Sequence, residues 1–179
     1  MPAPPVSQLP ITTSRLRIRA LRHGDADALH RVYGDPEAMR YVGRSGSART
    51  REQTGKVVSQ LIAGRRRQGY GLWAATLREG GEMIGLCGLT LVEDTGPDVE
   101  LVYLLGRSWW GQGYATEMAR ACLKAGFAGF ELARIVALAY PQNAASIRVM
   151  QKCGMRPAGT LAAHGHELVC YEALAASPT

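Results

Sequence analysis

A glycine-rich segment that joins a strand pattern to a helix pattern carries the clearest chemical signal in this sequence. The apolar run 101–105 is typical of a strand, Gly111-Gln112-Gly113 follows it, and a helical pattern begins near Ala115. Glycines let the backbone turn with its amides pointing outward, and a helix start adds unpaired N–H groups and a positive dipole end. This combination predicts a pyrophosphate site. A tight connection that binds nothing is the alternative.

Two well-known phosphate-binding motifs do not explain the segment. The sequence contains no GxxxxGK(S/T) motif, which excludes a nucleoside-triphosphate P-loop. The GxG from Gly111 to Gly113 lacks a third glycine, and no acidic residue follows on a second parallel strand at dinucleotide-binding spacing. A nicotinamide site therefore has weak support.

A second group of polar residues opens a later helix pattern. Asn143 stands at the N-terminus of a helix predicted to run to Lys152, Ser146 follows within its first turn, and Gly154 closes it as a left-handed cap. Glu100 opens the strand that precedes the glycine-rich segment. Each polar residue also has a purely structural explanation: Asn and Ser favour helix caps, and Glu100 could be an exposed carboxylate at a strand end.

These segments resemble motifs of the GNAT acetyltransferases. Residues 110–115, WGQGYA, resemble the Q/R-x-x-G-x-G/A pyrophosphate loop of that superfamily, with Trp110 in the first position. Residues 109–117, WWGQGYATE, are similar to the YWGxGYATE form of the branch that resembles the bacterial ribosomal-protein N-terminal (Rim-type) acetyltransferases. The NAAS at 143–146 and the MQKCGM at 150–155 resemble the N-x-x-S…x-x-K-x-G-F/M helix of the family.

The resemblance covers about residues 11–173, including TSRLRIR at 13–19, which fits the T-x-R-L-x-I/L-R opening of that branch. It implies the GNAT fold, an α/β fold with one central mixed, mostly antiparallel sheet and helices on both faces. It also implies acetyl-CoA as the cosubstrate, with pantetheine in a gap between the strand ending at Leu105 and the strand at 135–140. An N–H near Leu105 would hold the thioester oxygen. The cofactor-binding residues that the resemblance implies are Tyr103, Leu104, Leu105, Trp110, Gly111, Gln112, Gly113, Tyr114, Ala115, Thr116, Asn143 and Ser146.

Two catalytic roles follow from the same resemblance. Glu100 would act as the base for the attacking amine, through water. Many relatives place a tyrosine seven residues after the helix-opening Asn, and here that position is Met150, which cannot donate a proton. Ser146 is then the remaining donor near the expected thiol.

Length and composition restrict the class of protein. A chain of 179 residues is long enough for one domain with a real core, and 46% hydrophobic with 20% charged residues is typical of a soluble globular protein. We expect a flexible N-terminal lead-in over 1–10 and a single N-acetyltransferase domain over 11–175. The longest apolar run, 135–140, is too short to cross a bilayer, and the lead-in does not resemble a signal peptide. A cytoplasmic protein is therefore expected, with no membrane partner.

Charge, cysteines and histidines indicate few other ligands. The net charge of +6 could attract nucleic acid, but the densest cationic run, Arg65 to Arg67, ends a helix pattern without interleaved aromatic residues. Direct nucleic-acid binding is not expected.

His164 and His166 lie in a predicted hairpin loop, where they could line the acceptor entrance, and no metal site is predicted. Four cysteines are predicted to be buried free thiols: Cys87, Cys122, Cys153 and Cys170.

Hydrophobic periodicity predicts the element order β-α-α-β-β-β-α-β-α-β-β. The predicted strands cover residues 15–21, 72–77, 83–91, 99–105, 135–140, 155–161 and 167–174. The predicted helices cover residues 24–33, the stretch from a Thr50 capping box to Gly69, and residues 115–127 and 143–152. This order predicts one mixed sheet with helices on both faces.

The predicted function is the transfer of an acetyl group from acetyl-CoA to a primary amine in a ternary complex. The acceptor is either a protein N-terminal α-amine or a small-molecule amine. A non-catalytic acyl-CoA-binding module is the alternative. The sequence leaves the oligomeric state open, a homodimer included.

Overall fold

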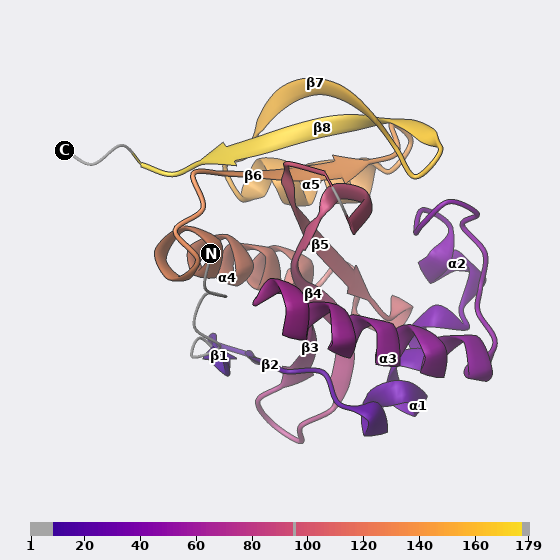
Figure 1. Cartoon of the computed structure of the whole chain (residues 1–179). Coiled ribbons are helices and arrows are strands. Elements are labelled where there is room, and N and C mark those ends of the chain that lie inside the picture. Colours follow the sequence, from indigo (N-terminus) through magenta and orange to yellow (C-terminus); the bar gives the residue numbers. More distant parts are fainter. Residues whose placement is uncertain (1–8, 95, 177–179) are drawn as a thin grey trace.

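The computed structural model describes residues 9–94 and 96–176 (Figure 1). Residues 1–8 of the predicted lead-in lie outside the described residues. The strands are β1 (Ile11–Thr12), β2 (Leu16–Arg19), β3 (Leu72–Leu77), β4 (Met83–Leu91), β5 (Val99–Leu105), β6 (Arg134–Ala139), β7 (Arg156–Ala163) and β8 (His166–Leu174). The α-helices are α1 (Ala26–Tyr33), α2 (Pro36–Met39), α3 (Arg51–Gln68), α4 (Tyr114–Gly129) and α5 (Ala144–Lys152). Short 3-10 turns are η2 (His23–Asp25), η3 (Val92–Asp94) and η4 (Arg107–Trp109).

All eight strands form one sheet in the order β1-β2-β3-β4-β5-β6-β8-β7. Neighbouring strands are antiparallel except β5 and β6, which are parallel. The register of this parallel pair consists of Glu100 opposite Val136, whereas β4 and β5 are paired from Gly85 opposite Leu105 to Leu91 opposite Val99. The strands β5 and β6 therefore diverge beyond Glu100, as the predicted gap requires.

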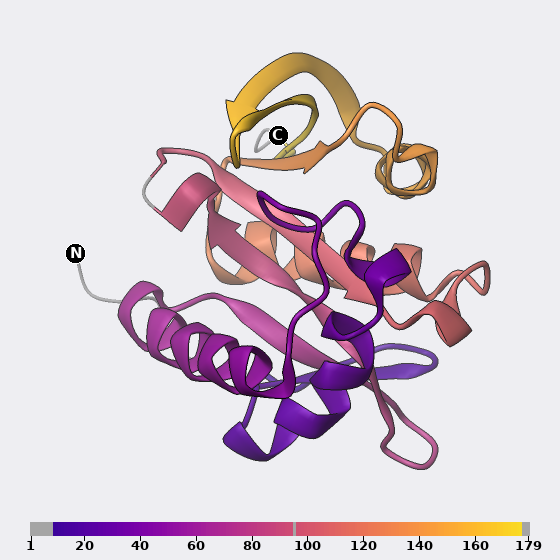
Figure 2. The same ribbon diagram turned by 90° about the vertical axis from the view of Figure 1, so that its right-hand side faces the viewer.

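Helices cover both faces of the sheet (Figure 2). One core joins Trp73, Cys87 and Leu105 to buried residues of α4 and to Met150 of α5. The other core joins alternate strand residues, such as Ala74 and Leu86, to α1, α2 and α3. Because successive side chains of a strand point to opposite faces, each strand of the sheet centre contributes to both cores. The predicted fold class is confirmed.

The element prediction is confirmed for the centre of the molecule and wrong at several edges. The strands at 72–77, 83–91 and 99–105 have the predicted bounds. The first long strand is shorter than the predicted 15–21, because Arg19 turns to pair with Asp25 at 2.7 Å. The strand predicted at 155–161 runs from Arg156 to Ala163. The Thr50 capping box is confirmed.

The cysteine prediction is confirmed for three of the four residues. Cys87, Cys122 and Cys170 are buried free thiols. Cys153 is only half-buried, because it lies at the exposed C-terminal end of α5. Its sulfur is 3.8 Å from the Thr116 carbonyl oxygen of α4.

We expect one glycine to be required for the close approach of β4 and β5. A Cβ atom on Gly85 would lie 2.0 Å from the Leu104 carbonyl oxygen, so Gly85→Ala forces two central strands apart. Overpacking of this kind costs about 1–3 kcal/mol, which lowers the melting temperature by several degrees. Gly55→Ala is the control, since this helical glycine has nothing within 4 Å of its Cβ position. It should raise stability by about 0.5–1 kcal/mol. Equal melting temperatures for the two variants would contradict the packing described.

Candidate functional site

The glycine-rich segment forms an open loop between β5 and α4. Gly111 and Gly113 have φ values of 74° and 82°, in the left-handed region that favours glycine. Gly113 is the N-cap of α4 and, among the described residues, no side chain caps this helix start. The amides of its first turn are therefore available to an anion. The indole N–H of Trp110 donates to the Leu105 carbonyl oxygen at 3.0 Å and holds the loop against the end of β5.

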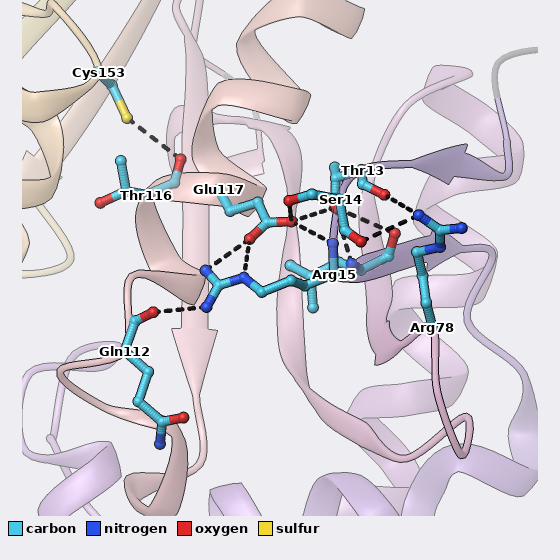
Figure 3. A network of polar contacts seen from close by, with 9 residues as sticks. Thr13, Ser14, Arg15, Arg78, Gln112, Thr116, Glu117 and Cys153 are labelled. Carbon is cyan, nitrogen blue, oxygen red and sulfur yellow. Dashed lines mark hydrogen bonds and ion pairs between the residues drawn. The ribbon is translucent and has the colours of Figure 1, made fainter.

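The carboxylate of Glu117 ties this loop to the N-terminal segment (Figure 3). Its Oε1 accepts hydrogen bonds from Thr13 Oγ1 at 2.6 Å, Ser14 Oγ at 3.0 Å and the Arg15 backbone N–H at 2.9 Å. Its Oε2 lies 2.7 Å from both Nε and Nη2 of Arg15. Burial alone would raise the pKa of Glu117, but these hydrogen bonds outweigh burial and lower the pKa to about 2.

Arg15 extends the same network to the loop itself. Its Nη1 donates to the Gln112 carbonyl oxygen at 2.9 Å, and its guanidinium lies 4.1 Å from the centre of the Tyr114 ring. One side chain thus contacts the loop, the first residue of α4 and the carboxylate of Glu117. The N-terminal segment and the glycine-rich loop, which the resemblance treats as separate motifs, form a single structural unit.

A cluster of hydroxyl groups bridges the gap between β5 and α5. The Asn143 side chain caps α5 by accepting from the Ser146 backbone N–H at 3.1 Å. The Tyr103 hydroxyl donates to the Ser146 carbonyl oxygen at 3.1 Å and lies 2.8 Å from Ser146 Oγ. Burial raises the pKa of Tyr103, although the hydrogen bond to Ser146 opposes this effect. The phenol therefore stays protonated and acts as a hydrogen-bond partner of the serine.

Glu100 lies on β5, at the point where β5 and β6 begin to diverge, and it is buried. Its Oε2 is 3.9 Å from Nε2 of His164, which lies in the turn between β7 and β8. The interaction with Glu100 raises the pKa of His164, and burial opposes this increase. A carboxylate and an imidazole thus meet at this end of the gap.

Two loops face each other beside this pair. The Nε2 atom of His166 is 2.9 Å from the Arg44 carbonyl oxygen. The centre of the His166 ring is 4.9 Å from the centre of the Tyr140 ring. The Tyr140 hydroxyl donates to the Gly43 carbonyl oxygen at 3.1 Å. These contacts hold the loop that follows α2 against the turn between β7 and β8.

The structure brings most predicted site residues together, and it adds partners that the sequence analysis missed. Tyr103 was expected to contribute its strand edge, yet its hydroxyl contacts Ser146. His164 was expected in a hairpin loop that could line the acceptor entrance, and its contact with Glu100 was not predicted. Met150 is buried in the core with 1% of its surface exposed, so it takes no part in the hydroxyl cluster. Among the described residues, no group of three His, Cys, Asp or Glu side chains could hold a metal ion. None of the described helices is long and apolar enough to cross a membrane.

Comparison with known proteins agrees with this geometry. The acetyltransferase (GNAT) domain family matches residues 15–156. The chain belongs to the GNAT acetyltransferase family. The protein YkkB of Bacillus subtilis (strain 168) is 33% identical to this GNAT acetyltransferase over 164 residues, covering 90% of this chain and 94% of YkkB.

Solved structures show the same fold. A GNAT-family acetyltransferase from Bacillus anthracis has a TM-score of 0.77 and 27% identity, covering 92% of this chain and 97% of that one. The ribosomal-protein α-N-acetyltransferase RimL, solved in complex with coenzyme A, has a TM-score of 0.76 and 22% identity, covering 93% and 97%. This second likeness is one of fold alone.

The lowered pKa of Glu117 leads to a prediction about acid stability. A carboxyl group whose pKa falls from 4.5 to about 2 on folding stabilises the fold above about pH 4.5, and this contribution is lost as the pH falls towards 2. Wild type should therefore melt above Glu117→Gln at pH 6, and the difference should shrink between pH 4.5 and 2. Glu52→Gln, which changes an exposed carboxylate of α3 paired with Lys56, should change the melting temperature only slightly, because exposed ion pairs contribute little. A Glu117→Gln difference that does not vary with pH would rule out the proposed charge network.

Proposed function

We propose that this GNAT acetyltransferase transfers an acetyl group from acetyl-CoA to a primary amine. The observation that carries the proposal is the divergence of β5 from β6 beside the open start of α4. An extended pantetheine chain fits along the free edge of a strand, and the amides of the first turn of α4 suit a pyrophosphate. The proposed contacts are those of residues 103–105 and 110–116, together with Asn143 and Ser146.

The acceptor amine would approach from the side of Glu100. An α-amine has a reference pKa of about 7.7–8.0 and is partly neutral at pH 7, whereas a lysine side chain at about 10.4 is not. Glu100, acting through water, would take the proton of the amine, whose nitrogen then attacks the thioester carbon. An N–H near Leu105 would stabilise the resulting oxyanion. A weak base suffices for an α-amine, so the proposed acceptor class is a protein N-terminus, as in the Rim-type branch, or a small molecule with a comparable amine.

Ser146 would stabilise the departing thiolate. When Tyr103 donates to the Ser146 carbonyl oxygen, the Ser146 hydroxyl can donate to the phenol oxygen; when Tyr103 donates instead to Ser146 Oγ, the serine proton is available to another acceptor. This second arrangement frees the serine proton for the sulfur. The raised pKa of Tyr103 disfavours a phenolate, so the pair would supply hydrogen bonds to the thiolate without giving up the phenol proton.

The test of the function is thiol release from acetyl-CoA with a panel of amines: a peptide with a free N-terminus, Nα-acetyl-lysine, spermidine and propylamine. We expect release that requires both acetyl-CoA and an amine.

If coenzyme A binds with a dissociation constant near ~10 μM, 1 mM ligand should add about 2.7 kcal/mol of stability, which raises the melting temperature by roughly 5–10 °C. Gly113→Val should abolish this shift by forcing a branched side chain into a left-handed position. A shift without turnover would favour the binding module, and no shift at all would refute both functions.

The hydroxyl cluster predicts a second result. Ser146→Ala should lower kcat by about 10–100-fold with nearly unchanged affinity for coenzyme A, since the hydrogen bond strengthens as the thiolate forms. Tyr103→Phe should also lower kcat, and the double variant should be no slower than Ser146→Ala, because the tyrosine acts through the serine. Steady-state kinetics and isothermal titration with coenzyme A separate these effects. Weaker binding of coenzyme A with an intact kcat would make Ser146 a structural residue only.

A further inference from the structure

The turn between β7 and β8 places an imidazole between a buried carboxylate and the solvent. The side chain of Glu100 is 10% exposed and that of His164 is 36% exposed, with 3.9 Å between Oε2 and Nε2. A buried base that takes a proton from its substrate must release that proton before the next turnover. The more exposed imidazole is placed to receive it.

The position of His164 is determined by the surrounding backbone. Its φ of 55° and the φ of 78° at Gly165 are those that the two-residue hairpin turn between Ala163 and His166 requires. The backbone N–H of His164 donates to Glu93 Oε1 at 2.7 Å, which holds the turn against η3. On its other side the turn is held through His166 and the Arg44 carbonyl oxygen. Two separate segments, η3 and the loop that carries Arg44, therefore hold the turn that places the imidazole beside Glu100.

The charged groups around His164 favour its protonated form. Glu100 on β5 has the largest influence, and Glu93 and Asp94 of η3 add to it, so the pKa of His164 is raised despite burial. The opposing charge nearby is that of Arg44, whose side chain packs beside Gly165. Two further titratable groups lie near this turn: His166, with a ring nitrogen 2.9 Å from the Arg44 carbonyl oxygen, and Tyr140, which packs against His166.

Proton affinity decides the direction of transfer within this pair. Reference pKa values are about 4.3 for a glutamic acid and about 6.5 for an imidazole, so a proton on a carboxylic acid moves favourably to a neutral imidazole. A base whose pKa is near the working pH is also more effective than one whose pKa is far below it. In this pair Glu100 is the buried group on the side of the amine, and His164 is the partner whose type of side chain has a reference pKa closer to neutral pH.

We propose that His164 is the proton-relay partner of Glu100 during acetyl transfer. The inference rests on the proposed function. The ammonium group of the acceptor loses one proton to Glu100, which passes it to Nε2 of neutral His164 and from there to water. The free amine then forms the C–N bond, the C–S bond breaks, and the second proton lost by the nitrogen is matched by the proton that the thiolate gains. One proton is released to solvent for each ammonium acetylated.

Two measurements test this relay. The first is kcat/KM for acetyl-CoA with propylamine and with the free-N-terminus peptide from pH 5.5 to 9, for wild type, His164→Gln and the control His23→Gln. The relay works only with a neutral imidazole, so wild-type kcat/KM should fall as the pH drops through the pKa of His164. In His164→Gln we expect a ~10-fold lower kcat/KM at pH 7, less than the ~10²–10⁴-fold of a direct general base because Glu100 remains, and no imidazole-dependent acid limb. His23→Gln should keep the wild-type profile, since His23 is exposed in η2 and its ring contacts Ser59 of α3.

The second measurement is an NMR titration of the four histidine imidazoles, which requires no acceptor. One resonance should titrate above the reference value, disappear in His164→Gln, and titrate at lower pH in Glu100→Gln. An acid limb that is unchanged in His164→Gln, or lost equally in His23→Gln, would overturn the relay while leaving the acetyltransferase function intact. A His164 resonance that does not respond to Glu100→Gln would overturn it as well. Wild-type protein that acetylates neither probe nor any other amine would instead refute the proposed function, and the relay with it.

Discussion

The ion pair between Glu117 and Arg15 is the interaction on which the arrangement of the proposed cofactor site depends. Glu117 lies in the first turn of α4, close to the loop expected to receive the phosphates of coenzyme A. An uncompensated negative charge there would repel an anionic ligand. Arg15 pairs with Glu117 and thereby neutralises its charge. The same guanidinium donates to the Gln112 carbonyl oxygen and so holds the loop in place. The first residues of the domain thereby determine the shape of a site that lies about a hundred residues later in the chain.

A second constraint is the unequal spacing of the central strands. The backbone of β4 approaches β5 so closely at Gly85 that no side chain fits, whereas β6 is paired with β5 through Glu100 and Val136. One side of β5 is thus fixed and the other diverges from its neighbour. The hydroxyl groups of Tyr103 and Ser146 meet across this divergence. The proposed chemistry is located where the regular sheet is interrupted.

The sequence predicted local features well and long-range contacts poorly. Apolar runs and the turn between them defined β3, β4 and β5, and the Thr50 cap and Gly154 defined helix ends, because each depends on a few neighbouring residues. The glycine-rich loop could be found for the same reason. The pairing of Glu100 with His164 depends on how β7 and β8 pack beside the sheet, which a single sequence does not encode as a readable pattern. Arg15 and Glu117 each belong to one of the motifs described above, but the contact between them appears only in the fold.

The most direct measurement of the central claim is a crystal structure with coenzyme A bound. The account predicts the pyrophosphate on the amides of residues 111–116, the pantetheine along the free edge of β5, and the sulfur within hydrogen-bonding distance of Ser146 Oγ. Arg15 should remain paired with Glu117 in that complex. Coenzyme A bound instead in the groove between the N-terminal segment and α4, lined by Arg15, Arg120 and Lys124, with the gap between β5 and β6 empty, would contradict the account.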